Sequence, residues 1–161
     1  MSGVTAAELA RQPFFARLGD LAEDIVDVVA EHARRVRLPE GHRLFVEGAV
    51  AHRWWIILDG RIDLEMHVPG KTEVVIESLG PGDVLGWSWL FPPYRWRLGA
   101  YVAEEATAFE VDAAALRERC ETSPVFGRAM YRWFAEVAID RLQATRNRLL
   151  EQAGTRPPSW I

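Results

Sequence analysis

Apolar residues recur with a helical period at both ends of the chain and in short alternating runs in the middle. Residues 1–34 contain apolar positions three or four residues apart, which indicates helices. Over 35–111 the runs are short and are interrupted by glycine about every ten residues, as in β-sandwiches and barrels. The helical period returns over 112–153. We therefore predict a single, mainly β domain with helices before and after the strands.

Two helices are expected in the first segment. Residues Thr5 to Glu8 have the sequence of a capping box, in which each side chain bonds the other residue's peptide N–H. A short helix should run from there to about Arg11 and stop near Pro13. A second helix is predicted over about 21–34, with Asp20 as its cap. The residues expected to pack inward between these helices are Phe14, Phe15 and Leu18.

Short strands separated by turns are expected in the second segment. They span 34–38, 43–46, 54–58, 61–67, 72–78, 84–85, 98–103 and 106–111. Apolar and charged side chains alternate over 61–67, so one face of that strand should be buried and the other exposed. Pro81 and Gly82 fit the two central positions of a type II turn.

Two further helices are expected in the third segment. Asp112 can cap a short helix that ends at about Cys120. Ser123 followed by Pro124 is a strong start signal for the last helix, which should continue to about Gln152. A helix of this length is not covered by one small β domain, so its distal half should protrude or contact a partner.

Composition and charge narrow the classes of function. The 161 residues suit one domain, and the content of 49% apolar and 26% charged residues is that of an ordinary globular protein. A net charge of −4 gives no basic footprint for nucleic acid. The arginines clustered at 34–37 and 141–148 are interpreted as solvated faces. The single cysteine, Cys120, excludes an internal disulfide and a cysteine metal site. No signal peptide or long apolar run is present, so a cytoplasmic protein that does not enter a membrane is expected.

The sequence shows no pattern of a catalytic or metal site. Ser88 lies between Gly86 and Leu90, so the second glycine of a hydrolase nucleophile elbow is missing. The four histidines, at 32, 42, 52 and 67, are scattered and lack the paired spacing of metal ligands. An enzyme of the cupin type would need clustered histidines on its strands. We therefore expect no enzymatic activity, no metal and no cofactor.

The stretch from Gly86 to Gly99 is unlike an ordinary strand or helix. It contains three tryptophans, two prolines and two arginines. Its first glycine permits a positive φ, and the peptide N–H groups that follow can bind an anion at the start of a short helical turn. Arg95 and Arg97 can then donate paired hydrogen bonds to a phosphate or carboxylate. The alternative interpretation places the arginines in solvent and the tryptophans in the core. These tryptophans are Trp87, Trp89 and Trp96.

Four segments of the chain resemble the cyclic-nucleotide-binding domain family. They are Leu38–Gly48, Trp55–Leu64, Leu79–Gly86 and Arg97–Ala103, and their glycine framework is specific when taken as a set. The resemblance implies a double-stranded β-helix of jelly-roll type, called a β-roll, with N-terminal helices and a long C-terminal helix. It also implies a regulatory, ligand-sensing function and makes residues 86–99 the phosphate-binding cassette of the family.

The cassette departs from the family pattern at one position. Family members usually carry a glutamate after the first glycine, where it binds the ribose 2′-hydroxyl, but this chain has Trp87. The family's arginine, which pairs with the cyclic phosphate, falls on Arg97. The resemblance therefore implies a site for a nucleotide or other anionic metabolite at which cyclic AMP binds weakly or not at all. The residues expected at this site are Gly86, Trp87, Ser88, Trp89, Leu90, Arg97 and Leu98, with Trp133 of the last helix as a lid.

Two interpretations of the function remain open. In the first, the chain is a small-molecule-sensing regulatory domain, and Arg97 pairs with an anionic ligand or with an acid such as Glu104 or Glu105. In the second, the domain is ligand-blind, aromatic side chains fill its pocket, and it acts by binding a protein partner. Trp87 discriminates between them, because its indole can either stack on a ligand or plug the site.

The last helix is expected to form a homodimer. Val137, Leu142 and Leu149 lie along it at spacings that suit packing against a second copy. The resemblance implies the same, since family members that regulate transcription dimerise through the matching helix. In those regulators a winged helix-turn-helix follows, whereas this chain reaches Ile161 without such a pattern. We therefore expect no DNA binding by this chain alone.

Overall fold

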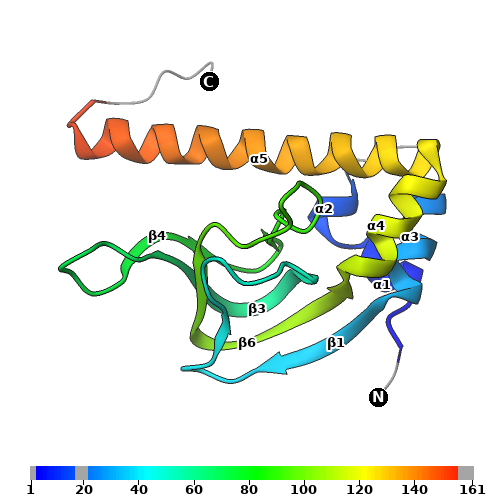
Figure 1. Cartoon of the computed structure of the whole chain (residues 1–161), viewed down its shortest axis with the longest axis horizontal. Helices are drawn as coiled ribbons and strands as arrows, with labels where there is room; N and C mark the ends of the chain where they lie inside the picture. The colour runs from blue at the N-terminus through cyan, green and yellow to red at the C-terminus, as the bar shows by residue number, and fades with distance from the viewer. Residues whose placement is uncertain (1–2, 17–21, 156–161) are drawn as a thin grey trace.

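The computed structural model describes residues 3–16 and 22–155. Within these residues, the chain forms an antiparallel β-roll with three helices before it and two after it (Figure 1). The elements are α1 (Ala6–Ala10), α2 (Pro13–Ala16), α3 (Ala22–Glu31), β1 (Ala33–Leu38), β2 (Arg43–Phe45), β3 (Arg53–Met66), β4 (Val74–Leu79), β5 (Val84–Leu85), β6 (Gly99–Asp112), α4 (Ala113–Thr122) and α5 (Pro124–Gln152). This mainly β architecture with flanking helices confirms the predicted fold class.

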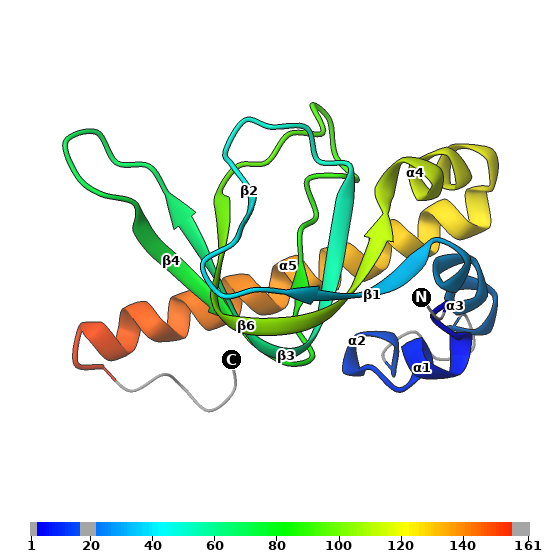
Figure 2. The same ribbon diagram turned by 90° about the horizontal axis from the view of Figure 1, so that it is seen from below.

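The sheet curls so that its two longest strands form the frame of the roll (Figure 2). Strands run in the order β1-β6-β3-β4, while β2 pairs with β6 and β5 pairs with β3. Strands β3 and β6 each span 14 residues and pair from Arg53 opposite Asp112 to Glu65 opposite Gly99. Helix α5 lies across one side of the roll, and α1, α2 and α3 pack against one another at the end of the roll where α5 begins (Figures 1 and 2).

Each of these long strands was predicted as two shorter ones, and that prediction was wrong. In β3 the expected break fell at Gly60, which has a φ of 84° but remains within the strand. A Cβ at this position would lie 2.2 Å from the carbonyl oxygen of Glu105 in β6. The glycine therefore permits the two strands to cross closely, with shifts in register on both sides of it, and does not end β3.

The capping signals are confirmed at three helices. Thr5 and Glu8 form the predicted capping box before α1. Asp112 accepts hydrogen bonds from the first peptide N–H groups of α4, and Ser123 caps α5. Helix α2 was not predicted, although Phe14 and Phe15 within it are buried as expected.

The predicted helix over 21–34 ends earlier, at Glu31, because Ala33 already pairs with Val111 of β6. The predicted cap Asp20 and the predicted core residue Leu18 lie outside the described residues.

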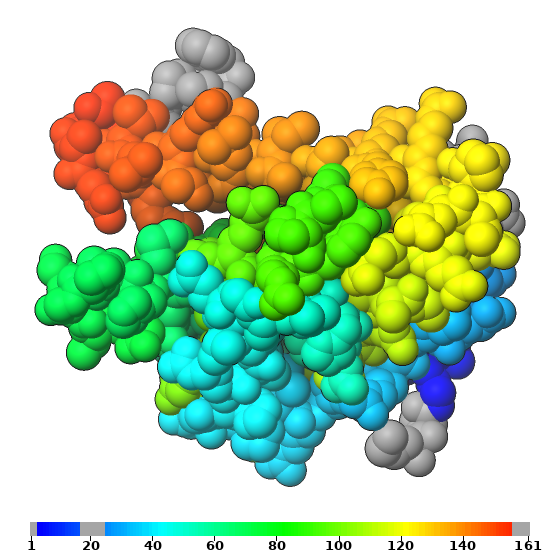
Figure 3. Space-filling model, in the orientation of Figure 1, coloured from blue at the N-terminus to red at the C-terminus, as the bar shows by residue number. Residues whose placement is uncertain are grey.

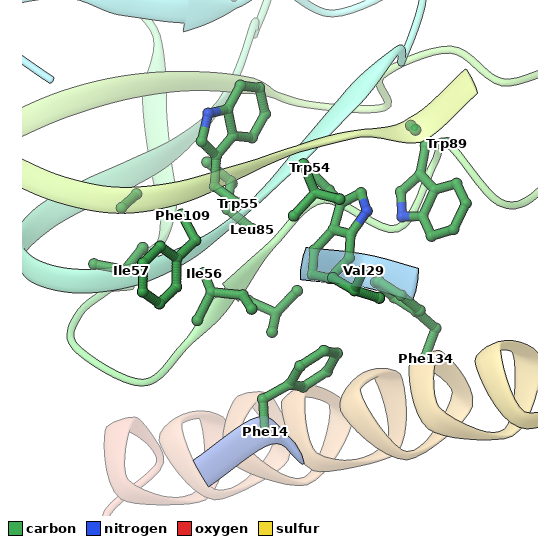
Figure 4. Close-up of a cluster of buried hydrophobic side chains, with 14 of the residues drawn as sticks. Phe14, Val29, Trp54, Trp55, Ile56, Ile57, Leu85, Trp89, Phe109 and Phe134 are labelled. Carbon is green, nitrogen blue, oxygen red and sulfur yellow. The ribbon is translucent and has the colours of Figure 1, made fainter. Parts of the chain in front are cut away.

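An aromatic cluster fixes the first half of α5 to the roll (Figure 4). Phe14 of α2 and Phe134 of α5 meet Trp54 of β3, with ring centroids 5.9 and 5.3 Å from it. Trp133 stacks on Phe14, and its indole N–H donates to the Phe14 carbonyl at 2.7 Å. The buried residues of α5 all lie between Phe126 and Phe134, so this half carries the packing.

The second half of α5 contacts the roll mainly through long polar side chains. Arg148, for example, donates to the carbonyl of Ile76 on β4 at 2.8 Å. In Figure 3 an open gap remains between the red end of the helix and the β3–β4 hairpin. The second half of α5 is therefore largely exposed, as the length of the predicted helix indicated.

Candidate ligand-binding site

A pocket of about 240 Å³ opens where the cassette, β4 and α5 meet. It is lined by Phe45, Leu64, Glu77, Leu85, Gly86, Trp87, Ser88, Trp96, Arg97, Leu98 and Arg141. Five predicted site residues are therefore brought together here, namely Gly86, Trp87, Ser88, Arg97 and Leu98. Trp89 and Leu90 are fully buried in the core and do not line the pocket.

The backbone of the cassette begins with the expected positive φ. Gly86 has a φ of 94°, and a Cβ there would lie 2.8 Å from the ring of Trp96. The next residues form a single turn, closed by a 3.0 Å hydrogen bond from the Leu90 N–H to the Trp87 carbonyl. Within the described part of the chain, the peptide N–H groups of residues 87–89 have no acceptor. Three donors beside the pocket are thus left for a ligand or solvent.

Arg97 is exposed at the pocket and makes no hydrogen bond or ion pair with any described residue. The acids proposed as its partners are engaged elsewhere. Glu104 pairs with Arg61 at 3.3 Å and Glu105 with Arg37 at 2.7 Å. That part of the prediction was wrong because both acids lie on the outside of β6, where they face neighbouring strands.

Arg95, the other cassette arginine, has a structural role. Its guanidinium donates to the carbonyl of Gly48 at 2.8 Å and so ties the cassette to the loop after β2. Arg95 and Arg97 also line one hollow together, so their binding of a phosphate or carboxylate stays a prediction.

The three cassette tryptophans have different environments. Trp89 and Trp96 are buried, as the alternative interpretation expected. Trp96 stacks on Phe45 with ring centroids 3.8 Å apart, and Phe45 in turn stacks on Trp55. Trp87 is only half-buried and forms part of the pocket wall.

Sequence reasoning missed Arg141, which reaches the pocket from α5. Its guanidinium carbon lies 4.8 Å from the centroid of the Trp87 ring, and its Nη2 donates to the carbonyl of Val84. Its Nε lies 4.0 Å from Glu77 Oε1, at the limit of an ion pair. Burial lowers the pKa of Arg141, and the nearby carboxylates of Glu77 and Asp83 partly offset that effect. The interpretation of all arginines in 141–148 as solvated was therefore wrong for this residue.

A second hollow of about 220 Å³ adjoins the first. Trp87, Ser88 and Arg97 line both, and the second is completed by side chains of the cassette and α5 that include Phe91, Phe134, Ala135 and Ala138. Trp87 therefore stands at the boundary between two hollows.

Trp133 and the proposed dimer residues lie apart from the pocket. Trp133 is in the core against Phe14 and does not cover the pocket as the predicted lid. Val137 packs against the core of its own chain, while Leu142 and Leu149 are 49% and 60% exposed. The three residues thus do not share one face of α5.

The described ranges 3–16 and 22–155 contain neither a metal-binding cluster nor a membrane-spanning helix. No group of three or more His, Cys, Asp or Glu side chains there is placed to hold a metal ion. None of the helices there combines the length and the apolar content needed to cross a bilayer.

Known proteins resemble this chain in sequence. The sequence model described as "Cyclic nucleotide-binding domain" matches residues 35–123. The CRP-like cAMP-activated global transcriptional regulator of Mycobacterium tuberculosis (strain ATCC 25618 / H37Rv) is 27% identical over 136 residues, which cover 84% of this chain and 59% of the regulator.

Solved structures give the same fold. A candidate cyclic nucleotide-binding protein from Geobacter metallireducens GS-15 has a TM-score of 0.75 at 24% identity, covering 86% of this chain and 98% of that one. The catabolite activator protein of Thermus thermophilus has a TM-score of 0.62 at 20% identity, covering 88% and 63%. Since the sequence model of the family matches more than half of the chain, this chain belongs to the cyclic nucleotide-binding domain family.

Proposed function

We propose that this chain is a regulatory domain that binds a small anionic molecule in the pocket beside Gly86. The observation that carries the proposal is the Arg97 guanidinium, which lines the pocket without a partner among the described residues. The peptide N–H groups of residues 87–89 lie in the same loop and are also unused. A guanidinium and peptide N–H groups without acceptors at one pocket suit a phosphate or carboxylate, because hydrogen bonds to an ionised acceptor are stronger than those between neutral groups.

Cyclic AMP is a poor fit for this pocket. Trp87 stands where the family usually has a ribose-binding glutamate, and an indole cannot accept a hydrogen bond. A buried hydroxyl left without a partner costs about 1–3 kcal/mol, which is roughly tenfold to more than a hundredfold in affinity. Trp87 also stands between two hollows of about 240 and 220 Å³, each of which is below the roughly 300 Å³ at which pockets for drug-sized ligands begin.

The proposed output is regulation through a dimer. Leu142 and Leu149 are exposed on the half of α5 that has no fully buried residue, so they are available to a second copy. Arg141 lies on the same half and contacts Trp87, so the cassette and the proposed dimer helix are in direct contact. The Mycobacterium tuberculosis relative is a transcriptional regulator, which supports regulation and not catalysis as the activity.

A thermal-shift screen over cyclic nucleotides, linear nucleotides and other anionic metabolites tests this proposal. A true ligand at about a hundred times its dissociation constant should stabilise the fold by roughly 2.7 kcal/mol. Arg97→Ala should abolish the shift. Arg128→Ala should retain it, because Arg128 is exposed on α5 and outside the lining of the pocket. A ligand whose shift survives Arg97→Ala would place binding elsewhere.

The contact between Trp87 and Arg141 favours a second candidate function, a ligand-blind interaction module. In that case the two side chains fill the pocket permanently. The screen then gives no hit, and Trp87→Ala leaves association with a protein partner intact unless the cassette itself is the contact surface.

A further inference from the structure

Glu77 of β4 is a carboxylate without a hydrogen-bond donor at the wall of the pocket. Its side chain is 15% exposed, and no described residue donates a hydrogen bond to it. Its nearest cation, Arg141 Nε, is 4.0 Å away, while Arg141 Nη2 donates instead to the Val84 carbonyl. The ion pair with Arg141 balances the charge of this carboxylate, but no described residue donates a hydrogen bond to its oxygens, so they can accept one from a ligand in the pocket.

We propose that Glu77 is a specificity-determining residue and that the ligand is an anion, smaller than a nucleotide, that also donates hydrogen bonds. The inference rests on the proposed function and assigns one group of the ligand to each of two charged side chains of the pocket. Arg97 holds the anionic group, and Glu77 accepts from a hydroxyl or an ammonium. An ionised carboxylate can only accept hydrogen bonds, so an aliphatic group opposite it would leave it unsatisfied.

The position of Glu77 within the pocket supports this assignment. Arg141 contacts both Trp87 and Glu77, so the carboxylate lies at the Trp87 end. At that end the cassette presents Trp87, whose indole accepts no hydrogen bond. Glu77 thus provides an acceptor from β4 in place of one from the loop, and Trp87 takes up part of the volume that a whole nucleotide would need.

Matched phosphate probes test the proposal on the full chain. Ribose 5-phosphate is compared with cyclopentylmethyl phosphate, which keeps the ring and the phosphate but lacks the hydroxyls. The second pair, 4-aminobutyl phosphate and butyl phosphate, differs in an ammonium. Binding is followed by the indole N–H resonance of Trp87, assigned with Trp87→Phe. We expect at least one donor-bearing probe to bind tenfold or more tightly than its hydrocarbon partner, and the pair that shows this distinguishes hydroxyl from ammonium.

Substitutions distinguish the role of Glu77 from the proposed function of the pocket as an anion site. Glu77→Gln and Glu77→Ala should reduce the preference for the donor-bearing probe to less than threefold, while the hydrocarbon probe binds as before. Arg97→Ala should abolish binding of all four probes, and Arg146→Ala, at an exposed position of α5, should change nothing. Equal binding within both pairs, or a preference that survives both Glu77 variants, overturns the role of Glu77 alone. If no phosphate binds and Arg97→Ala has no effect on any resonance, the proposed function falls as well.

Discussion

Replacing Gly86 by alanine perturbs the close approach that shapes the start of the cassette. The φ of 94° costs a residue with a side chain about 1–2 kcal/mol. The new methyl group would also lie 2.8 Å from Cη2 and Cζ3 of Trp96, a ring held by its stack on Phe45. Overpacking of this kind typically costs about 1–3 kcal/mol. We therefore expect Gly86→Ala to destabilise the fold by about 2–5 kcal/mol.

Two further variants separate the backbone cost from the contact. Gly48 has a φ of 83°, and an added Cβ there meets no atom within 4 Å, so Gly48→Ala should cost only the conformational part. Trp96→Phe removes the two contacted ring atoms, so in that background Gly86→Ala should cost about 1–2 kcal/mol. Urea denaturation followed by circular dichroism gives all of these free energies. If Gly86→Ala costs no more than Gly48→Ala, or if Trp96→Phe brings no relief, the packing argument is refuted.

Other expectations concern the core, the dimer, the thiol and DNA. Trp133→Phe removes the donor to the buried Phe14 carbonyl and should cost about 1–3 kcal/mol in the same denaturation assay; no measurable loss would contradict the role of that bond. The double variant Leu142→Asp with Leu149→Asp should be monomeric by light scattering. Val125→Asp should remain dimeric, because Val125, which is 71% exposed, lies at the other end of α5. A native protein that is monomeric at high micromolar concentration would contradict the proposed dimer. Burial, assisted by Glu121, raises the pKa of Cys120 to about 11, so the thiol should react slowly with Ellman's reagent at pH 8. An unfolded thiol ionises near 8.5, so stability should fall as the pH rises from there toward 11, and Cys120→Ala should remove that dependence. A gel shift with duplex DNA should show no sequence-selective binding in the range of about 10⁻⁸–10⁻¹¹ M.

The sequence correctly predicted those features that depend only on residues close together in the chain. The caps at Thr5, Asp112 and Ser123 involve residues two or three positions apart, so the order of residues is sufficient to identify them. Gly60 shows the opposite case. Whether a glycine ends a strand depends on the backbone that packs against it. At Gly60 this is the backbone of Glu105, which lies 45 positions further along the chain.

The same distinction holds at the pocket. Gly86, Trp87 and Arg97 were identified because they lie in one contiguous segment of unusual composition. Arg141 and Glu77 were missed because they reach the pocket only through the path of α5 across the roll and the register of β4 against β3. Trp133 was misplaced for a similar reason, since its contact with Phe14 joins segments more than a hundred residues apart.

The most direct test of the proposed site is isothermal titration of the native protein and of Trp87→Glu with cyclic AMP. We expect the native protein to bind with a dissociation constant weaker than about 10 μM, or not at all, because Trp87 offers no acceptor in the cassette and its indole takes up part of the volume that a whole nucleotide needs. Trp87→Glu, which restores the carboxylate beside Arg141, should bind at least about tenfold more tightly. Native binding below about 10 μM, or a Trp87→Glu variant that binds no better, would contradict the account of this pocket.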